Sequence, residues 1–168
     1  MKKIGLLSDT HGYIDDKIFS YFDKCDEIWH AGDIGHVENI EQLEAFLPLR
    51  GVYGNIDGAS IRAIFPENAI WTCEGMKVLM THIGGYPGRY NSRVKKMLDE
   101  HQPQLYICGH SHILKIIPDK KRKLLHINPG AAGNHGFHKI KTLVRFHVDA
   151  GRIQNLEVIE IGERGRIA

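Results

Sequence analysis

The sequence contains few cysteines and no pattern of paired cysteines. Cys25, Cys73 and Cys108 are far apart, and no two of them form a C-x-x-C motif. An odd number of scattered cysteines indicates reduced thiols rather than a disulfide framework. Because the chain also opens without a signal-peptide pattern, we expect a cytoplasmic location.

Long hydrophobic runs and low-complexity segments are missing as well. No apolar stretch approaches the ~20 residues of a membrane span, which excludes a transmembrane helix. The sequence has no linker or internal repeat, so we expect a single domain over residues 1–168. Its one strongly basic run, residues 120–123, follows Pro118 and Asp119 between two strand patterns. That context indicates a solvated hairpin turn, and we do not expect a nucleic-acid partner.

Hydrophobic periodicity predicts an α/β fold. Strand and helix patterns alternate in the first half of the chain, whereas the second half consists mostly of strands. This order favours two mixed β-sheets packed as a sandwich and flanked by helices. The expected strands span residues 3–8, 27–31, 49–53, 69–73, 76–81, 104–108, 113–117, 123–127, 142–148 and 153–160, and the expected helices span residues 14–24, 37–47 and 90–101.

Eight side chains with metal-binding atoms stand in five short groups, each at the end of an apolar run. They are Asp9 and His11, then Asp33, then Asn55 and Asp57, then His82, and finally His110 and His112. Open α/β sheets bind ligands just outside the carboxyl ends of their strands, so five strand ends can converge on one site. In D-x-H and H-x-H, residues i and i+2 of an extended chain point the same way and can hold one ion.

The donor atoms indicate which metals would bind. Imidazole nitrogen combined with carboxylate and amide oxygen, without cysteine, suits a borderline divalent ion. Eight candidate groups are too many for one ion that keeps a position open for water, but they are the right number for two. We therefore expect two divalent transition metal ions, manganese first, with iron, nickel, cobalt or zinc as alternatives.

The order DxH, GD, GNxD, an isolated histidine and GHxH resembles the calcineurin-like metallophosphoesterase superfamily. The motifs S-D-T-H-G at 8–12 and N-P-G at 128–130 are similar to those of its small single-domain bacterial and archaeal phosphodiesterases, which are relatives of the eukaryotic retromer scaffold subunit. The resemblance runs from Met1 to about Val158. It implies a four-layer fold and a two-metal phosphoesterase, in which a metal-bridging hydroxide attacks the phosphorus of a small phosphate ester in line.

The same resemblance implies how the ligands are divided. One ion would be bound by Asp9, His11, Asp33 and His112. The other would be bound by Asp33, Asn55, His82 and His110, so that Asp33 bridges the two ions. Asp33, Asn55 and His82 are also the expected catalytic residues, while Asp57 and Asn128 support the ligands from behind. Because Asn55 is a neutral ligand, two dications face only two carboxylates, and the net positive site attracts a phosphate.

Three alternatives remain open. A metal-binding scaffold for protein–protein interaction is the first, although all four candidate histidines are present and favour the enzyme. The second is a phosphomonoesterase, which we rank below a phosphodiesterase. In the third, Ser8 or Cys108 acts as a covalent nucleophile, and we disfavour it because the nearby histidines serve better as ligands. The sequence leaves the oligomeric state open, a homo-oligomer included.

One position departs from the superfamily pattern. Many members have a histidine inside the GNxD motif that protonates the leaving oxygen, and Ile56 stands there in this chain. Isoleucine cannot donate a proton, so esters with poor leaving groups should react slowly. His36, His135 and His138 lie in predicted loops near strand ends, where a solvated surface histidine is the more common interpretation.

Arg89 is the candidate for substrate binding. It follows a Gly-Gly-Tyr-Pro-Gly turn after the isolated histidine, and a guanidinium there can form paired hydrogen bonds with a phosphate. The structural alternative is that Arg89 only opens the helix that follows. The sequence favours neither interpretation.

Overall fold

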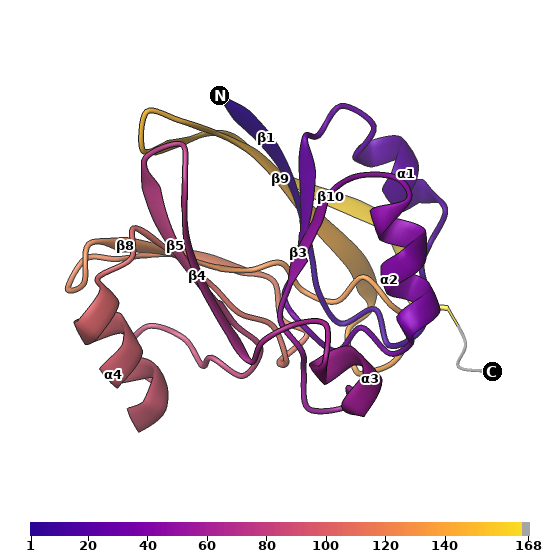
Figure 1. The fold of residues 1–168 in the computed structure, drawn as a ribbon, viewed down its shortest axis with the longest axis horizontal. Helices are drawn as coiled ribbons and strands as arrows, with labels where there is room; N and C mark the ends of the chain where they lie inside the picture. The colour runs from indigo at the N-terminus through magenta and orange to yellow at the C-terminus, as the bar shows by residue number, and fades with distance from the viewer. Residues whose placement is uncertain (166–168) are drawn as a thin grey trace.

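The computed structural model describes residues 1–165, which form two five-stranded β-sheets with helices on their outer faces (Figure 1). The first sheet has the strand order β10-β9-β1-β2-β3, and the second has the order β4-β5-β6-β8-β7. The strands are β1 (Lys2–Leu7), β2 (Glu27–His30), β3 (Leu49–Gly51), β4 (Asn68–Cys73), β5 (Met76–Thr81), β6 (Leu105–Ile107), β7 (Lys115–Asp119), β8 (Leu124–Asn128), β9 (Ile140–Asp149) and β10 (Arg152–Glu163). The helices are α1 (Lys17–Tyr21), α2 (Val37–Glu44), α3 (Ala59–Arg62) and α4 (Ser92–His101).

Alternating side chains divide the core into layers. On β1, Leu6 packs between the two sheets, whereas the next residue, Leu7, packs outward against α1 and α2. Trp29 lies at the centre of the inner layer, edge-on to Trp71 and Phe146 at ring distances of 4.9 and 5.7 Å. Removing so large a buried ring typically costs about 3–5 kcal/mol, so this contact does much to hold the sheets together.

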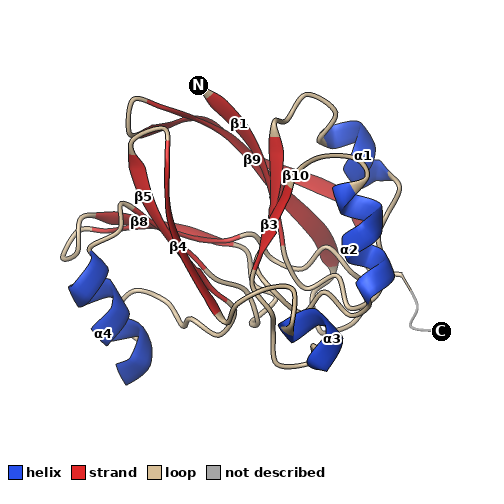
Figure 2. Ribbon diagram, viewed as in Figure 1, coloured by secondary structure: helices blue, strands red, loops and turns tan. Residues whose placement is uncertain are grey.

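The outer layers complete the sandwich. Helix α4 covers the second sheet through Val94 and Leu98, which pack on Leu79 and Tyr106. The result is the order helix, sheet, sheet, helix that Figure 2 shows, and it confirms the predicted two-sheet α/β sandwich. Among residues 1–165, no helix has the length and hydropathy that crossing a bilayer requires.

Parallel pairing brings the carboxyl ends of several strands together. β1 pairs in parallel with β2, and β2 pairs in parallel with β3. In the second sheet, β5, β6 and β8 are likewise parallel. The loops that follow these strands gather at the lower edge of the molecule in Figure 1, near α3. These loops carry the polar groups that the sequence singled out.

The helices differ from the prediction in two places. The helix expected over residues 14–24 is regular only over α1, because the chain turns at Phe22 and the Cys25 amide bonds the Phe22 carbonyl. Helix α3 was not expected. It has only four residues, too few for a helical period to appear in the sequence.

Candidate metal centre

Loops from both sheets bring six titratable side chains into two groups of three. Asp9, His11 and His112 form one group, and Asp33, His82 and His110 form the other. Within each group, the potential ligand atoms all lie within 4.8 Å of one another. Asp9, His11 and Asp33 follow strands of the first sheet, whereas the other three histidines follow β5 and β6 of the second. The candidate site therefore spans the sandwich.

Asp33 connects the two groups. Its Oδ2 atom lies 3.3 Å from His11 Nε2 and 3.2 Å from His82 Nε2. Asp9 Oδ1 lies 3.1 Å from His112 Nε2, and it lies 3.8 Å from the Nε2 atoms of His11 and His82. The Asp33 carboxylate, the side chain expected to bridge, therefore lies between a histidine of each group.

Asn55 joins the second group, since its Oδ1 atom lies 3.0 Å from His110 Nδ1. On the opposite side, His82 Nδ1 lies 2.8 Å from the carbonyl oxygen of Ala31. A carbonyl can only accept, so Nδ1 carries a proton and Nε2, which faces Asp33, is the ring atom that would bind a metal after losing its proton. The structure thereby brings together all seven residues predicted as ligands.

The charges in the site are strongly coupled. Burial raises the pKa of the Asp9 and Asp33 carboxyls, but hydrogen bonds from the surrounding histidines outweigh it and hold both pKa values well below their usual range. Burial lowers the pKa of His11, yet Asp33 and Asp9 raise it to about 9. Without a metal, protons on the imidazoles hold the two carboxylates together.

Buried polar atoms without partners test whether a metal fits. Asp9 Oδ1, His11 Nε2 and His82 Nε2 are buried and form no well-aligned hydrogen bond among the described residues. Asp9 Oδ1 lies 3.8 Å from both of these nitrogens, so a cation held among the three atoms would supply the missing partner. The donor set, nitrogen and oxygen without sulfur, suits a divalent transition metal.

Five of the candidate ligands have left-handed backbones. The φ angles are 55° at Asp9, 47° at His11, 56° at Asp33, 71° at His110 and 61° at His112. Residues with a Cβ atom seldom adopt this region, and when they do they cluster at functional sites. All five lie in the loops that follow β1, β2 and β6, where a left-handed residue turns the chain.

Two motif glycines are explained by close contact. A Cβ atom at Gly54 would collide with the side chain of Asp33, and one at Gly109 would collide with Ser8 Oγ and Asp9 Oδ2. The GN and GH motifs therefore need glycine because the neighbouring ligands pack directly on the backbone.

Asp57 and Asn128 fix the loops that carry the ligands. The Asp57 carboxylate accepts hydrogen bonds from the amides of Ile34, Gly35 and Gly54 at 2.8–3.1 Å. Asn128 Nδ2 donates to Gly109 O and to Ser111 Oγ, both at 3.0 Å. These hydrogen bonds tie Asp57 to the loops that carry Asp33 and Asn55, and they tie Asn128 to the loop that carries His110.

The sequence profile of the calcineurin-like phosphoesterase superfamily domain matches residues 1–151. The chain belongs to the calcineurin-like phosphoesterase superfamily. A probable metallophosphoesterase of Methanothermobacter thermautotrophicus is 27% identical to it over 135 residues, which cover 76% of each chain. The profile match confirms the family resemblance read from the motifs. The family implies divalent metal ions, and the two groups of side chains described above are candidates to hold them.

Solved structures share the fold at low sequence identity. An archaeal phosphodiesterase described as novel is 21% identical, with a TM-score of 0.70 over 95% of this chain and 99% of that one. Zinc-bound Vps29 from Entamoeba histolytica is 13% identical, with a TM-score of 0.72 over 94% of this chain and 98% of that one. At these identities the likeness establishes the fold of this superfamily member.

Two further histidines contact the candidate ligands. The ring of His135 stacks on His11 at 4.7 Å, and the ring of His138 lies 5.2 Å from His112 while its Nε2 bonds Gly133 O at 2.8 Å. The loop position of His135 and His138 favoured a surface role, and only the tertiary structure brings them to the site. His36, by contrast, is the N-cap residue of α2, where its backbone amide donates a hydrogen bond to Asn39 Oδ1 at 3.2 Å.

His30 is a residue whose part in the site the sequence did not indicate. It is fully buried, its Nε2 lies 3.0 Å from Thr10 Oγ1, and its Nδ1 accepts from the Gly32 amide. Burial lowers its pKa to about 4, so it is neutral near pH 7. His30 thus ties the DxH loop to the GD loop. In the sequence, His30 alternates with apolar residues in a strand-like run, as an ordinary core residue does.

Two cavities adjoin the centre. One of about 290 Å³ is lined by His11, Asp33, Asn55, both histidines of the GHxH motif, and the exposed Ile56 and Phe137. The other, of about 280 Å³, is lined by Asn55 and His82 together with Arg62 of α3 and Arg93 of α4. Arg89 is exposed and lines neither of them.

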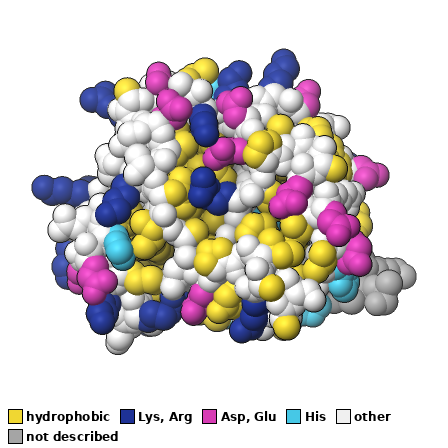
Figure 3. Space-filling model, viewed as in Figure 1, with side chains coloured by type: hydrophobic (Ala, Val, Ile, Leu, Met, Phe, Trp, Pro, Cys, Tyr) yellow, Lys and Arg dark blue, Asp and Glu magenta, His cyan; other side chains and the backbone are white. Residues whose placement is uncertain are grey.

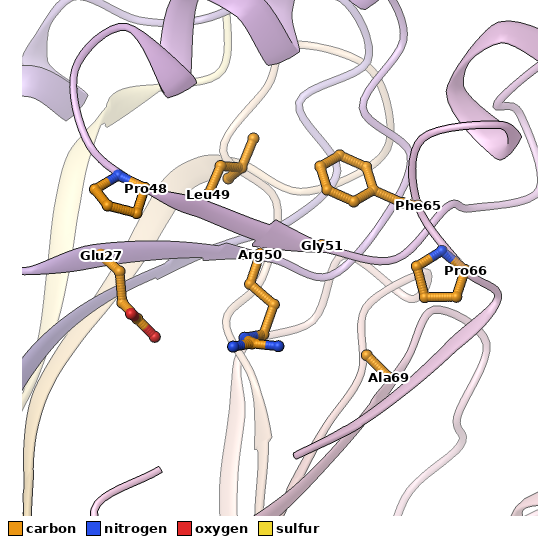
Figure 4. Close-up of a pocket in the computed structure, with 8 residues that line it drawn as sticks. All are labelled: Glu27, Pro48, Leu49, Arg50, Gly51, Phe65, Pro66 and Ala69. Carbon is orange, nitrogen blue, oxygen red and sulfur yellow. The ribbon is translucent and has the colours of Figure 1, made fainter. Parts of the chain in front are cut away.

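A third cavity lies away from the centre, between the open edges formed by β3 and β4 (Figure 4). Its volume is about 340 Å³, and its lining includes Glu27, Arg50 and Phe65. The Arg50 guanidinium lies 4.5 Å from the Trp71 ring. No member of the two ligand groups reaches this cavity.

Proposed function

We propose that the protein is a two-metal phosphodiesterase that hydrolyses a small phosphate ester. The observation that carries the proposal is the pair of three-residue groups joined through Asp33, whose Oδ2 atom lies within 3.3 Å of a histidine nitrogen from each group. In this assignment Asp9, His11, Asp33 and His112 hold one ion. Asp33, Asn55, His82 and His110 hold the other.

The ions, when bound, supply a nucleophile derived from water and positive charge for the phosphoryl oxygens. The side chains of the protein provide the rest. Asp33 sets the spacing of the two sites, and Asn55 contributes an oxygen ligand without adding negative charge. The His82 ring is fixed by the Ala31 carbonyl, so its free nitrogen is aimed at Asp33 before any ligand arrives.

A phosphodiester fits the site better than a monoester. Asn55 lies between the two adjoining cavities and lines both, so each ester group of a diester has its own space. Ile56 is 46% exposed in the first cavity and cannot protonate a leaving group. We therefore expect aryl esters to react faster than alkyl esters, with water or His135 as the remaining proton sources.

The substrate is proposed to be small rather than a polymer. Lysine and arginine side chains are interspersed with acidic ones on the face in Figure 3. Binding of a nucleic-acid backbone relies on a continuous basic surface. A substrate of limited size, held by the ions and the two cavities, suits this distribution of charge.

A protein-binding scaffold is the second candidate, because Vps29 shares the fold. Complete ligand groups favour the enzyme, since a surface that only docks a partner does not need two buried carboxylates among four histidines. Manganese and a cytoplasmic location stay predictions from the sequence.

The deciding experiment is a metal screen. Apo-protein is reloaded with Mn, Fe, Co, Ni, Zn or Mg, and metal content and hydrolysis are measured on an activated diester and the matching monoester. We expect close to two equivalents of bound metal and faster diester hydrolysis. Saturation at one ion with full activity would refute the two-metal proposal, and two tightly bound ions without hydrolysis of either ester would favour the scaffold.

A further inference from the structure

The cavity between α3 and α4 contains two arginines with no acidic partner. Figure 1 shows these helices on opposite sides of the loops that follow β3 and β5. Arg62 and Arg93 line the space together with Asn55 and His82, which belong to the proposed metal centre. Among residues 1–165, neither guanidinium lies within 4.0 Å of a carboxylate. Glu67 also lines the cavity but pairs with neither.

Neutral oxygens hold Arg93 in place. Its NH1 donates to Asn68 Oδ1 at 2.8 Å and to Thr81 Oγ1 at 3.3 Å, and its NH2 donates to Ile83 O at 2.9 Å. These contacts orient the guanidinium without neutralising its charge, and Nε is left free to donate. Ile83 directly follows His82, so the arginine is anchored next to a proposed ligand.

Arg62 is held in a similar way. Its Nε donates to the carbonyl oxygen of Asp57 at 2.7 Å, and its guanidinium lies 4.5 Å from the Tyr53 ring. Both terminal nitrogens remain available. Asp57 also fixes the loop before Asn55, so Arg62 is attached to the same loop as a proposed ligand.

The start of α4 adds to the positive potential. Asn91 lines the cavity and caps α4 by accepting a hydrogen bond from Val94 N at 2.9 Å. Arg93 lies in the first turn of this helix. A cation is unfavourable at a helix N-terminus, where the backbone dipole is positive. Three hydrogen bonds nevertheless hold Arg93 there, so its positive charge faces a cavity in which Glu67 lines the wall but pairs with neither arginine.

We propose that this cavity is a subsite for a second anionic group, so that the substrate is a small phosphodiester with a carboxylate or a further phosphate on one ester arm. The proposal rests on the phosphodiesterase function proposed above. Asn55 connects the subsite to the metal centre, and planar guanidinium groups suit both anions through paired hydrogen bonds. The opposite cavity, with Ile56 and Phe137, receives the less polar arm.

Three matched substrates test the subsite on the manganese-loaded protein. They are p-nitrophenyl ethyl phosphate, p-nitrophenyl 2-carboxyethyl phosphate and p-nitrophenyl 2-phosphonooxyethyl phosphate, which share a leaving group and differ in the charge of the other arm. We expect kcat/KM to be about tenfold or more higher for the charged diesters, mainly through KM, as for a charge-assisted hydrogen bond. The two charged arms distinguish a carboxylate from a phosphate.

Variants assign the effect to residues. Arg62→Gln and Arg93→Gln should each reduce the ratio of kcat/KM for the charged diester to that for the neutral diester by about tenfold. Arg93→Lys should restore part of it. Arg152→Gln, at the exposed first residue of β10, is the control. If Arg93 were merely structural, all three substrates would lose activity equally, and that result would overturn its assignment. A selective loss in Arg89→Gln alone would move the subsite to Arg89.

A binding measurement separates this proposal from the proposed function. Calorimetry compares 2-carboxyethyl phosphate with ethyl phosphate on the wild type and on both glutamine variants. Tighter binding of the charged ligand that disappears in the variants supports the subsite even when no diester is hydrolysed, an outcome that refutes only the phosphodiesterase. Equal affinities together with equal kcat/KM values overturn the subsite while leaving the phosphodiesterase intact.

Discussion

Asp33→Asn tests the proposed centre most directly. The Asp33 carboxylate lies 3.2–3.3 Å from histidines of both groups, so it is the one proposed ligand that the two ions share. Its φ angle is 56°, in the left-handed region that asparagine adopts more readily than alanine does. Asparagine therefore removes the charge while it keeps the side-chain shape and the turn.

Simple electrostatics gives the size of the effect. Unit charges about 4 Å apart interact by about 4 kcal/mol at an effective dielectric constant of about 20, so two dications at the spacing of two-metal sites repel by about 16 kcal/mol. A shared carboxylate opposes this repulsion, but a neutral amide does not. We expect bound manganese to fall from two equivalents to one. The value of kcat/KM should fall at least about 10³-fold, since losing one transition-state donor already costs about 10²–10³.

The assay combines elemental analysis with diester kinetics on protein whose fold is checked by circular dichroism. Asp23→Asn, on the exposed turn after α1, is the matched control and should bind two ions with wild-type activity. Two tightly bound ions and unchanged hydrolysis in Asp33→Asn would show that Asp33 does not bridge.

Three further predictions follow from the surroundings of the ligands. Asp57→Asn weakens the hold on three loop amides, so manganese affinity measured by calorimetry should fall about 10–100-fold, and an unchanged affinity would contradict the supporting role. Ile56→His, at the exposed rim, should flatten the dependence of rate on leaving-group pKa, whereas an unchanged slope would mean that the proton comes from elsewhere. Metal binding needs a neutral His11. Burial lowers the pKa of His11, but Asp33 and Asp9 raise it to about 9, so manganese affinity should increase from pH 6 towards pH 9, and an affinity independent of pH would contradict this coupling.

Strand ends were predictable because two signals coincide there. Short β-prone runs stop at Leu7, His30 and Ile107, and metal-binding side chains follow each of them within a few residues. Parallel pairing then brings such ends to one edge, so the convergence of the seven proposed ligands required no knowledge of the turns themselves. The sandwich architecture followed from the same pattern.

The turn geometry and the arginine cavity could not be predicted in this way. The left-handed φ angles of His11 and His110 cannot be predicted from the residue type, because contacts with the surrounding structure impose them. Arg62 lies on a four-residue helix, and Arg93 depends on oxygens from Asn68 and Ile83, which are 25 and 10 residues away. Local sequence pointed instead to Arg89, beside its glycine-rich turn.

The energetics of the metal-free site bear on whether it is an enzyme centre or a docking surface. Asp33 Oδ2 lies 3.2–3.3 Å from the nitrogens of two histidines, and Asp9 Oδ1 lies 3.1 Å from the nitrogen of a third. Burial disfavours the charged forms of both carboxyls and of His11, and only their contacts with one another keep them ionised. A docking surface gains nothing from such buried charges, because its contacts lie outside the chain. Divalent cations held by these side chains would replace the protons and supply the compensating charge. The buried charges are therefore explained by chemistry at metals more readily than by partner binding alone.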